Sequence, residues 1–216
     1  MDLPVALLLL ADSRLPAGGH AHSGTVAAAV DAGLVQDLDG LTRFLRGRLA
    51  TAGLVAAAVA ARAARVLDDG PALVALDAEV DARTPSRAAR EASRAQGRGL
   101  LRAVSSTWPG PALALLPDRP HAAVAQGAAA VAVGSGPAEA AGLAALTAVT
   151  SPAWAAVRLL GLDPLSVTAV LALLAPEVER IATLGLHSHE LPAASGPLLD
   201  LLAQAHTRTE VRLFAS

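Results

Sequence analysis

The chain has 216 residues, of which 53% are apolar and 17% charged, and its formal net charge is −2. This length can bury one sizeable core, and this apolar content excludes wholesale disorder. The sequence contains no cysteine, lysine or tyrosine. It therefore offers no thiolate nucleophile, cysteine-ligated metal site, Schiff-base lysine or P-loop lysine.

Composition favours helices, because 53 alanines and 37 leucines supply most of the apolar residues and only four residues are aromatic. Ser23, Ser86 and Asp163 are predicted to cap the helices that follow them, Asp39 precedes another helix start, and glycine or proline marks the stops. Two prolines, Pro152 and Pro176, fall inside helices and are expected to perturb them. We expect about ten helices, over 3–11, 24–32, 41–52, 54–67, 71–83, 87–107, 121–133, 137–160, 164–184 and 197–205.

No linker or repeat divides these segments, so the sequence predicts one all-α globular domain over residues 1–216. Alanine and glycine on many helix faces predict helices that approach closely. Residues 140–157 carry no charge, which touches the length of a membrane span, but alanine, glycine and Pro152 favour a buried central helix. A small membrane protein remains an alternative. The acidic start does not resemble a secretory signal, and we expect a cytoplasmic protein with no membrane association.

Two His-x-His pairs are the candidate metal ligands. His187 and His189, with Glu190, lie between two predicted helices, and His20 and His22 lie in an earlier loop. Neither spacing supplies the three or four ligands that zinc sites use, and no serine-nucleophile motif occurs. We therefore expect no catalytic residues, no metal site and no cofactor. A small metal-binding or hydrolytic enzyme that uses His187, His189 and Glu190 is kept as the alternative function.

Arginines recur along one predicted helix at positions 87, 90, 94, 98 and 102, within an arc of roughly 120°. This face is either simply solvated or a docking surface for an acidic partner, since arginine forks bind carboxylates bidentately. Nucleic acid is not expected, because the chain is net negative and lacks aromatic residues for base stacking.

Residues 207–216 form a C-terminal tail that contains one of the two phenylalanines, Phe214. Chain ends are usually polar and loose, so an apolar anchor beside Arg212 and Leu213 suggests a segment that orders on binding a partner. Packing of the tail on its own domain is the alternative.

Three segments resemble the UreF family of urease accessory proteins. The first is Ala11-Asp12-Ser13-Arg14-Leu15-Pro16-Ala17-Gly18-Gly19-His20-Ala21-His22-Ser23-Gly24, which is similar to the family's N-terminal signature. The second is Arg90-Glu91-Ala92-Ser93-Arg94-Ala95-Gln96-Gly97-Arg98-Gly99-Leu100-Leu101, and the third runs from Pro197 to Ser216. The spacing of these segments agrees with that of the family along the whole chain. His20 and the use of arginine for every basic residue resemble actinobacterial members of the family. The chain departs from many members at His20, where they have an aromatic residue, and at Thr25-Val26, where they have Leu-Glu.

The resemblance implies a dimeric, all-α, non-catalytic maturation chaperone. It would bind the scaffold UreD, also called UreH, and recruit the GTPase UreG, so that nickel reaches apo-urease. By the same resemblance, a loop built by Asp12, Ser13, Pro16, Gly18, Gly19, His22 and Ser23 would face the GTPase. Arg212, Leu213 and Phe214 would order against the scaffold. From the arginine face described above, and not from the resemblance, Arg90, Arg94 and Arg98 are further candidates for partner binding.

Overall fold

The computed structural model describes residues 5–12, 15–17, 21–207 and 214. Within these residues the chain forms helices and no strand, which confirms the predicted all-α fold. The α helices are α1 (Val5–Ala11), α2 (Val26–Asp31), α3 (Leu38–Arg48), α4 (Leu54–Arg65), α5 (Gly70–Ala82), α6 (Arg87–Thr107), α7 (Ala122–Ala132), α8 (Pro137–Leu160), α9 (Pro164–Leu186) and α10 (Pro197–His206). A π-helical turn, Leu49–Gly53, joins α3 to α4, and a 3₁₀ turn, Pro111–Leu115, precedes α7.

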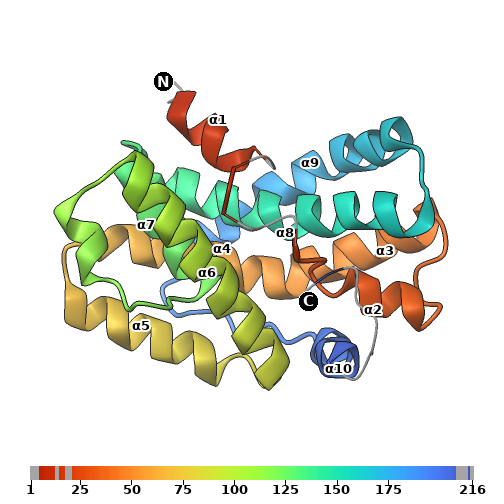
Figure 1. Cartoon of the computed structure of the whole chain (residues 1–216), viewed down its shortest axis with the longest axis horizontal. Helices are drawn as coiled ribbons and strands as arrows, with labels where there is room; N and C mark the ends of the chain where they lie inside the picture. Colours follow the sequence, from red (N-terminus) through yellow and green to blue (C-terminus); the bar gives the residue numbers. More distant parts are fainter. Residues whose placement is uncertain (1–4, 13–14, 18–20, 208–213, 215–216) are drawn as a thin grey trace.

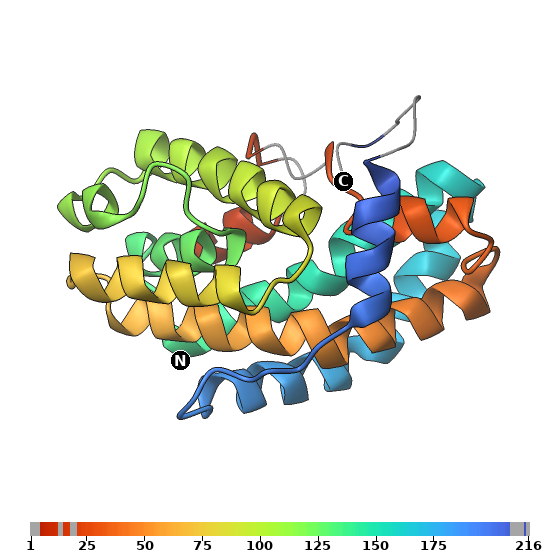
Figure 2. The same cartoon turned by 90° about the horizontal axis from the view of Figure 1, so that it is seen from below.

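Helices α4 and α8 form the centre of the molecule, and each contacts α7 and α9 (Figure 1). Helices α5 and α6 cover this centre at one end, whereas α2 and α3 cover it at the other. Helix α10 contacts both α2 and α6 and lies beside the N-terminal end of α6 (Figure 2). The buried side chains form two main clusters, one around α2, α3, α8 and α9 and one around α4, α5 and α7.

Small residues let the central helices approach closely, as the composition predicted. A Cβ atom built on Gly127 of α7 would lie 2.4 Å from the Ala60 carbonyl oxygen of α4. One built on Gly185 of α9 would lie 2.7 Å from the Ala57 Cβ of α4. No side chain fits at such distances, so glycine at these two positions sets the spacing of three helices.

The helix expected over 41–52 begins earlier and does not stop at Gly53. It begins at Leu38, because the Asp37 Oδ1 atom accepts a hydrogen bond from the Gly40 amide at 2.7 Å and caps the first turn. Gly53 has helical φ and ψ and is the last residue of the π turn, so the helical backbone continues directly into α4. The first turn of α2 also differs from expectation. Gly24 and Thr25 both have positive φ, so α2 begins at Val26.

The apolar character of α8 follows from its central position. Among the described residues it is one of two helical stretches long and apolar enough to span a membrane, the other being Leu38–Arg65. Within α8, 56% of the most apolar window is buried inside the protein, against α4, α7 and α9. This burial accounts for the uncharged run over 140–157 without a membrane.

Candidate partner-binding cavity

A cavity of about 790 Å³ lies between α6, α10 and the central helices α4 and α8. Its walls include His22 from the loop before α2, Arg87 and Gln96 from α6, and His206 from α10. These residues belong to, or directly adjoin, the three segments that the sequence analysis singled out. The fold therefore brings together segments that lie more than 60 residues apart in the chain.

The loop before α2 is held by short-range hydrogen bonds. The Leu15 amide donates to the Asp12 carbonyl at 3.0 Å, and the buried Ser23 Oγ accepts from the Ala27 amide at 3.3 Å. Ser23 thus accepts from the first turn of α2, but the N-cap residue is Thr25 and not Ser23 as predicted. His22 is also buried, whereas Pro16 is exposed. Three further residues predicted for this loop, Ser13, Gly18 and Gly19, lie outside the described residues.

Helix α6 seats the turn that leads into α7. The Ser93 Oγ accepts a hydrogen bond from the Ala122 amide at 3.1 Å, and a Cβ on Gly97 would lie 2.0 Å from the Pro120 carbonyl oxygen. Ser93 and Gly97 are two of the residues quoted for the family resemblance. The contact with the turn explains their spacing on α6. It requires a short hydroxyl side chain at Ser93 and no side chain at Gly97, one helical turn later.

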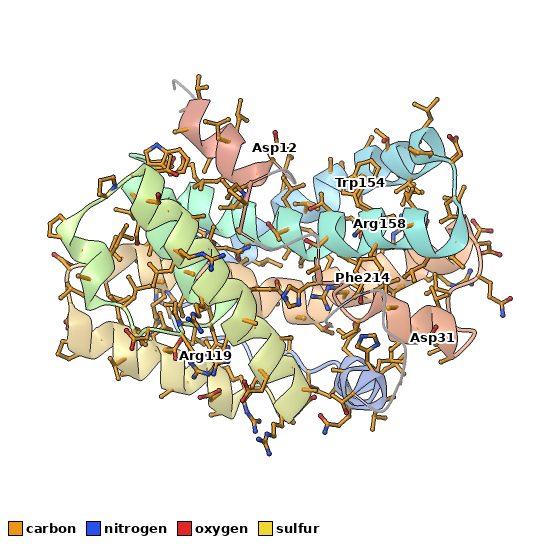
Figure 3. All side chains as sticks on the ribbon, viewed as in Figure 1. Asp12, Asp31, Arg119, Trp154, Arg158 and Phe214 are labelled. Carbon is orange, nitrogen blue, oxygen red and sulfur yellow. The ribbon has the colours of Figure 1, made fainter. Side chains whose placement is uncertain are left out.

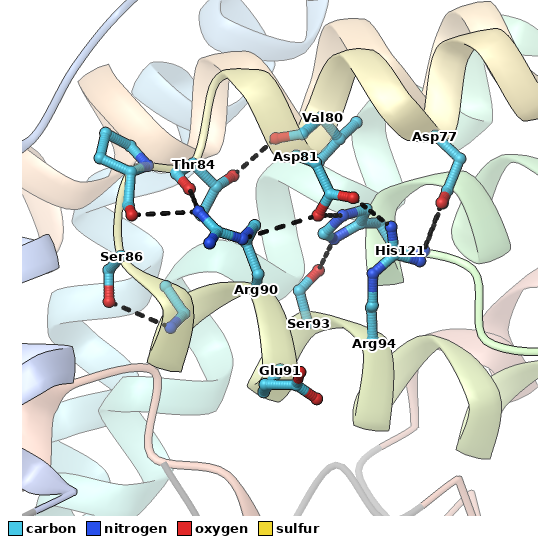
Figure 4. A network of polar contacts seen from close by, with 12 residues as sticks. Asp77, Val80, Asp81, Thr84, Ser86, Arg90, Glu91, Ser93, Arg94 and His121 are labelled. Carbon is cyan, nitrogen blue, oxygen red and sulfur yellow. Dashed lines mark hydrogen bonds and ion pairs between the residues drawn. The ribbon is translucent and has the colours of Figure 1, made fainter.

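Two aspartates of α5, a histidine and an arginine complete this junction (Figure 4). His121 is fully buried, and its Nε2 lies 2.9 Å from Asp81 Oδ1 while its Nδ1 lies 3.0 Å from Ser93 Oγ. Arg94 donates to Asp77 Oδ2 at 2.9 Å and to Asp81 Oδ2 at 2.6 Å. The Asp77 Oδ1 also accepts from the His121 amide at 2.7 Å.

The electrostatics of this network favour neutral His121 beside ionised carboxylates. Burial lowers the pKa of His121 and outweighs the opposing hydrogen bond from Asp81. Burial alone would raise the pKa of Asp81, but hydrogen bonds from Arg94 and His121 outweigh it and lower that pKa. For Arg94, burial is again outweighed, by hydrogen bonds to Asp81 and Asp77, and its pKa is raised. We assign the His121 Nε2 proton to the hydrogen bond with Asp81, and Ser93 then donates to Nδ1.

The predicted arginine face of α6 divides into two groups. Arg90 donates to the Thr84 and Pro85 carbonyls at 2.6 and 3.0 Å, and Arg94 joins the aspartates of α5. Arg98 and two neighbours on the same face, Arg87 and Arg102, are exposed and form no ion pair with a described residue. Two of the three arginines predicted to meet a partner therefore hold the fold together.

Of the predicted tail residues only Phe214 is described, since Arg212 and Leu213 are not. Phe214 is 4% exposed and packs in the cluster around α2, α3, α8 and α9. The Arg158 guanidinium carbon lies 4.6 Å from the centre of its ring (Figure 3). The His206 Nε2 donates to the Phe214 carbonyl at 3.1 Å. At this residue the tail packs on its own domain, which is the alternative left open above.

The structure brings no other metal-ligating side chains to the described histidines of the two pairs, His22, His187 and His189, in a number that could hold a metal ion. Among the described residues, no three histidines, aspartates or glutamates lie close enough together to hold a metal ion. His187 ends α9, and its Nδ1 is 2.8 Å from the Thr183 carbonyl oxygen. His20 lies outside the described residues.

Comparisons with known proteins agree with the sequence segments. The UreF family model matches residues 35–175. A protein of Mycolicibacterium vanbaalenii named urease accessory protein UreF is 50% identical over 216 residues, which cover all of both chains. Proteins of the same name from Mycobacterium sp. strain JLS and Mycobacterium tuberculosis strain H37Ra are 48% and 44% identical, covering 100% and 97% of each chain.

Proposed function

Because this chain belongs to the UreF family of urease accessory proteins, we propose that it is a non-catalytic scaffold in the insertion of nickel into apo-urease. In this function it binds a UreD-type scaffold, also called UreH, and recruits a UreG-type GTPase. It acts in the cytoplasm as a homodimer, and nickel passes through the assembly as cargo. The relatives are named accessory proteins, and the chain is accordingly an accessory protein and not an enzyme.

One observation supports this proposal best. The three segments that resemble the family border one cavity, instead of each serving a separate part of the fold. A cavity lined by a loop, a helix face and a C-terminal helix can contact a partner through all three at once. Pro16 and Arg98 do not line the cavity, but both are exposed and suited to direct contact with a partner, whereas Asp12, His22 and Ser23 shape the loop to which Pro16 belongs.

Exposed apolar side chains also support a function in an assembly. Leu8 and Leu9 of α1 are about half exposed, and Trp154 of α8 is 36% exposed. Leu165 and Leu201, on α9 and α10, are 79% and 68% exposed. Side chains of this size on several helices fit a chain that buries further surface against a second copy and other proteins.

The proposal is tested by urease activation in the source cells. Removing this chain, while the urease subunits and the other accessory proteins are still produced, should leave urease without nickel and inactive. Supplying the wild-type chain should restore both properties. Full urease activity and nickel content without the chain would contradict the proposal.

A further inference from the structure

Arg48 is one of two arginines lining the cavity that form no ion pair with a described residue, and it is the one that lies deeper in the protein. It ends α3 just before the π turn and lines the cavity beside Gly24 and Thr25. Its Nε donates to the Ala148 carbonyl oxygen at 3.0 Å. That carbonyl is free because Pro152, four residues later in α8, has no amide hydrogen to donate to it.

The rest of the guanidinium has no acceptor among the described residues. The two Nη groups form no hydrogen bond or ion pair with a described residue. A Cβ on Gly24 would lie 3.4 Å from the Cζ and from Nη2, so the loop backbone covers one side of the group. Burial lowers the pKa of Arg48 to about 10, which still leaves it charged at neutral pH. Arg48 is half-buried and its Nη donors are open to the cavity, so it favours an anionic acceptor there, and two parallel N–H groups match a carboxylate.

The other charges of the cavity do not compete for Arg48. Glu91 pairs with Arg119 at 3.1 Å, and Asp200 Oδ1 accepts from the Ser86 amide at 3.2 Å. Arg87, at the α6 wall, is a second cation that forms no ion pair with a described residue. Arg48 and Arg87 outnumber Asp200, which also forms no ion pair with a described residue, so the uncompensated charge of these three residues is positive.

The size and walls of the cavity indicate a ligand larger than an inorganic anion. Its volume of about 790 Å³ is in the range of pockets that hold molecules much larger than one oxoanion. Val55, Val59 and Val80 line it, and Leu199 of α10 lies on another wall. A short polypeptide segment that presents one acidic side chain beside apolar ones fits both the charge and the apolar walls.

We propose that Arg48 binds the carboxylate of an acidic side chain that a partner polypeptide inserts into this cavity. The partner rests on the proposed function, whereas the carboxylate site at Arg48 rests on the structure alone. The two are therefore tested by separate arms of one experiment.

The first arm measures partner capture. The full chain, Arg48→Met and Arg43→Met are each co-expressed with the UreD-type scaffold and the UreG-type GTPase from the same source, and the captured proteins are quantified. Methionine keeps the length of the side chain and removes the charge. Arg43 is an exposed residue of the same helix and serves as the matched control. We expect Arg48→Met to reduce capture of one partner at least tenfold and Arg43→Met to leave it unchanged.

The second arm uses acetate as a carboxylate probe on the isolated chain. Acetate replaces chloride at constant ionic strength, and the thermal unfolding midpoint is followed. We expect acetate to raise the midpoint of the wild type and of Arg43→Met but not of Arg48→Met. The midpoint of Arg48→Met in chloride also shows whether this variant is folded.

The outcomes separate the two claims. Undiminished capture by Arg48→Met overturns the partner carboxylate, and an acetate response together with undiminished capture indicates a site for free carboxylates only. If the wild type captures no partner, the proposed function fails and the acetate arm alone decides the site. Equal acetate responses in wild type and Arg48→Met, or none in either, overturn the Arg48 site.

Discussion

His121 is fully buried, yet both of its ring nitrogens have partners, Asp81 and Ser93. It joins α5, α6 and the start of α7, and with Asp77 and Arg94 it forms a network in which each charge is compensated. A polar network of this kind stabilises the fold only while every member keeps its partners.

The lowered pKa of His121 gives the chain a pH-dependent stability. An unfolded histidine takes up its proton near pH 6.5, whereas buried His121 resists it, so protons bind preferentially to the unfolded state. Asp81, whose pKa is lowered, stays ionised in this range. The free energy of unfolding should therefore fall as the pH drops from 7.5 through about 6.5 toward the native pKa. Urea denaturation at several pH values between 7.5 and 5.5 measures this slope.

The slope is assigned to His121 by substitution. His121→Gln should remove part of it, while exposed His187→Gln should leave it unchanged. Equal slopes in His121→Gln and the wild type would show that the pH dependence arises elsewhere.

Arg94 and Arg98 are neighbours on α6 with opposite expected effects. Arg94→Met leaves Asp77, whose side chain is only 7% exposed, without its cation, and should lower the free energy of unfolding by about 2–4 kcal/mol. Arg98→Met should change it by no more than about 0.5 kcal/mol. Chemical denaturation of the two variants compares them. Equal effects would mean that the ion pairs of Arg94 contribute nothing.

At the scale of the helices, the contact between α4 and α7 depends on the missing side chain at Gly127. Gly127→Ala places a methyl group against the Ala60 carbonyl oxygen, so the helices must separate, and we expect a loss of about 1–3 kcal/mol in the free energy of unfolding. Gly142, within α8, has no atom within 4 Å of such a Cβ. Gly142→Ala should instead stabilise the chain by about 0.5–1 kcal/mol, because alanine is the better helix former. Thermal unfolding of both variants gives the signs, and a stabilising Gly127→Ala would contradict the close packing.

Sequence patterns predict such elements unevenly. Ser86 and Asp163 cap their helices as expected, since capping depends on residues within one turn. The continuation through Gly53 is not predictable in this way, because a π turn is stabilised by contacts from other helices. Gly97 and Gly127 indicate close packing from sequence, but only the fold shows which backbone each one meets.

At the scale of the whole molecule, the all-α class and the family follow from the sequence, whereas the cavity does not. His22, Arg48 and His206 lie on one cavity because α2, α3 and α10 converge at one end of the fold. No local pattern singles out Arg48. Its proposed role depends on the carbonyl of Ala148, a hundred residues later in the chain, which Pro152 leaves free. Likewise, the sequence does not show that Arg94 forms ion pairs with Asp77 and Asp81, because these aspartates lie on another helix.

Phe214 links the C-terminal tail to the core, so the tail should contribute to stability. Phe214→Ala removes the contacts with Arg158 and the cluster around α8, and should lower the free energy of unfolding by about 1.5–3 kcal/mol. Leu201→Ala, at a position 68% exposed, should have little effect. Chemical denaturation compares these variants. No loss in Phe214→Ala would indicate that the tail leaves the core in solution.

The measurement that tests the central claim most directly is copurification with the UreD-type scaffold from the same source. The full chain and a version lacking residues 207–216 are each co-expressed with that scaffold, and their folding is checked by circular dichroism. If the scaffold assembles with this chain, we expect a stoichiometric complex with the full chain. Deletion of the tail should abolish or weaken this complex. Equal binding by both versions would support the assembly function but would show that the tail is not part of the interface. Two folded versions that both fail to bind the scaffold would contradict the account.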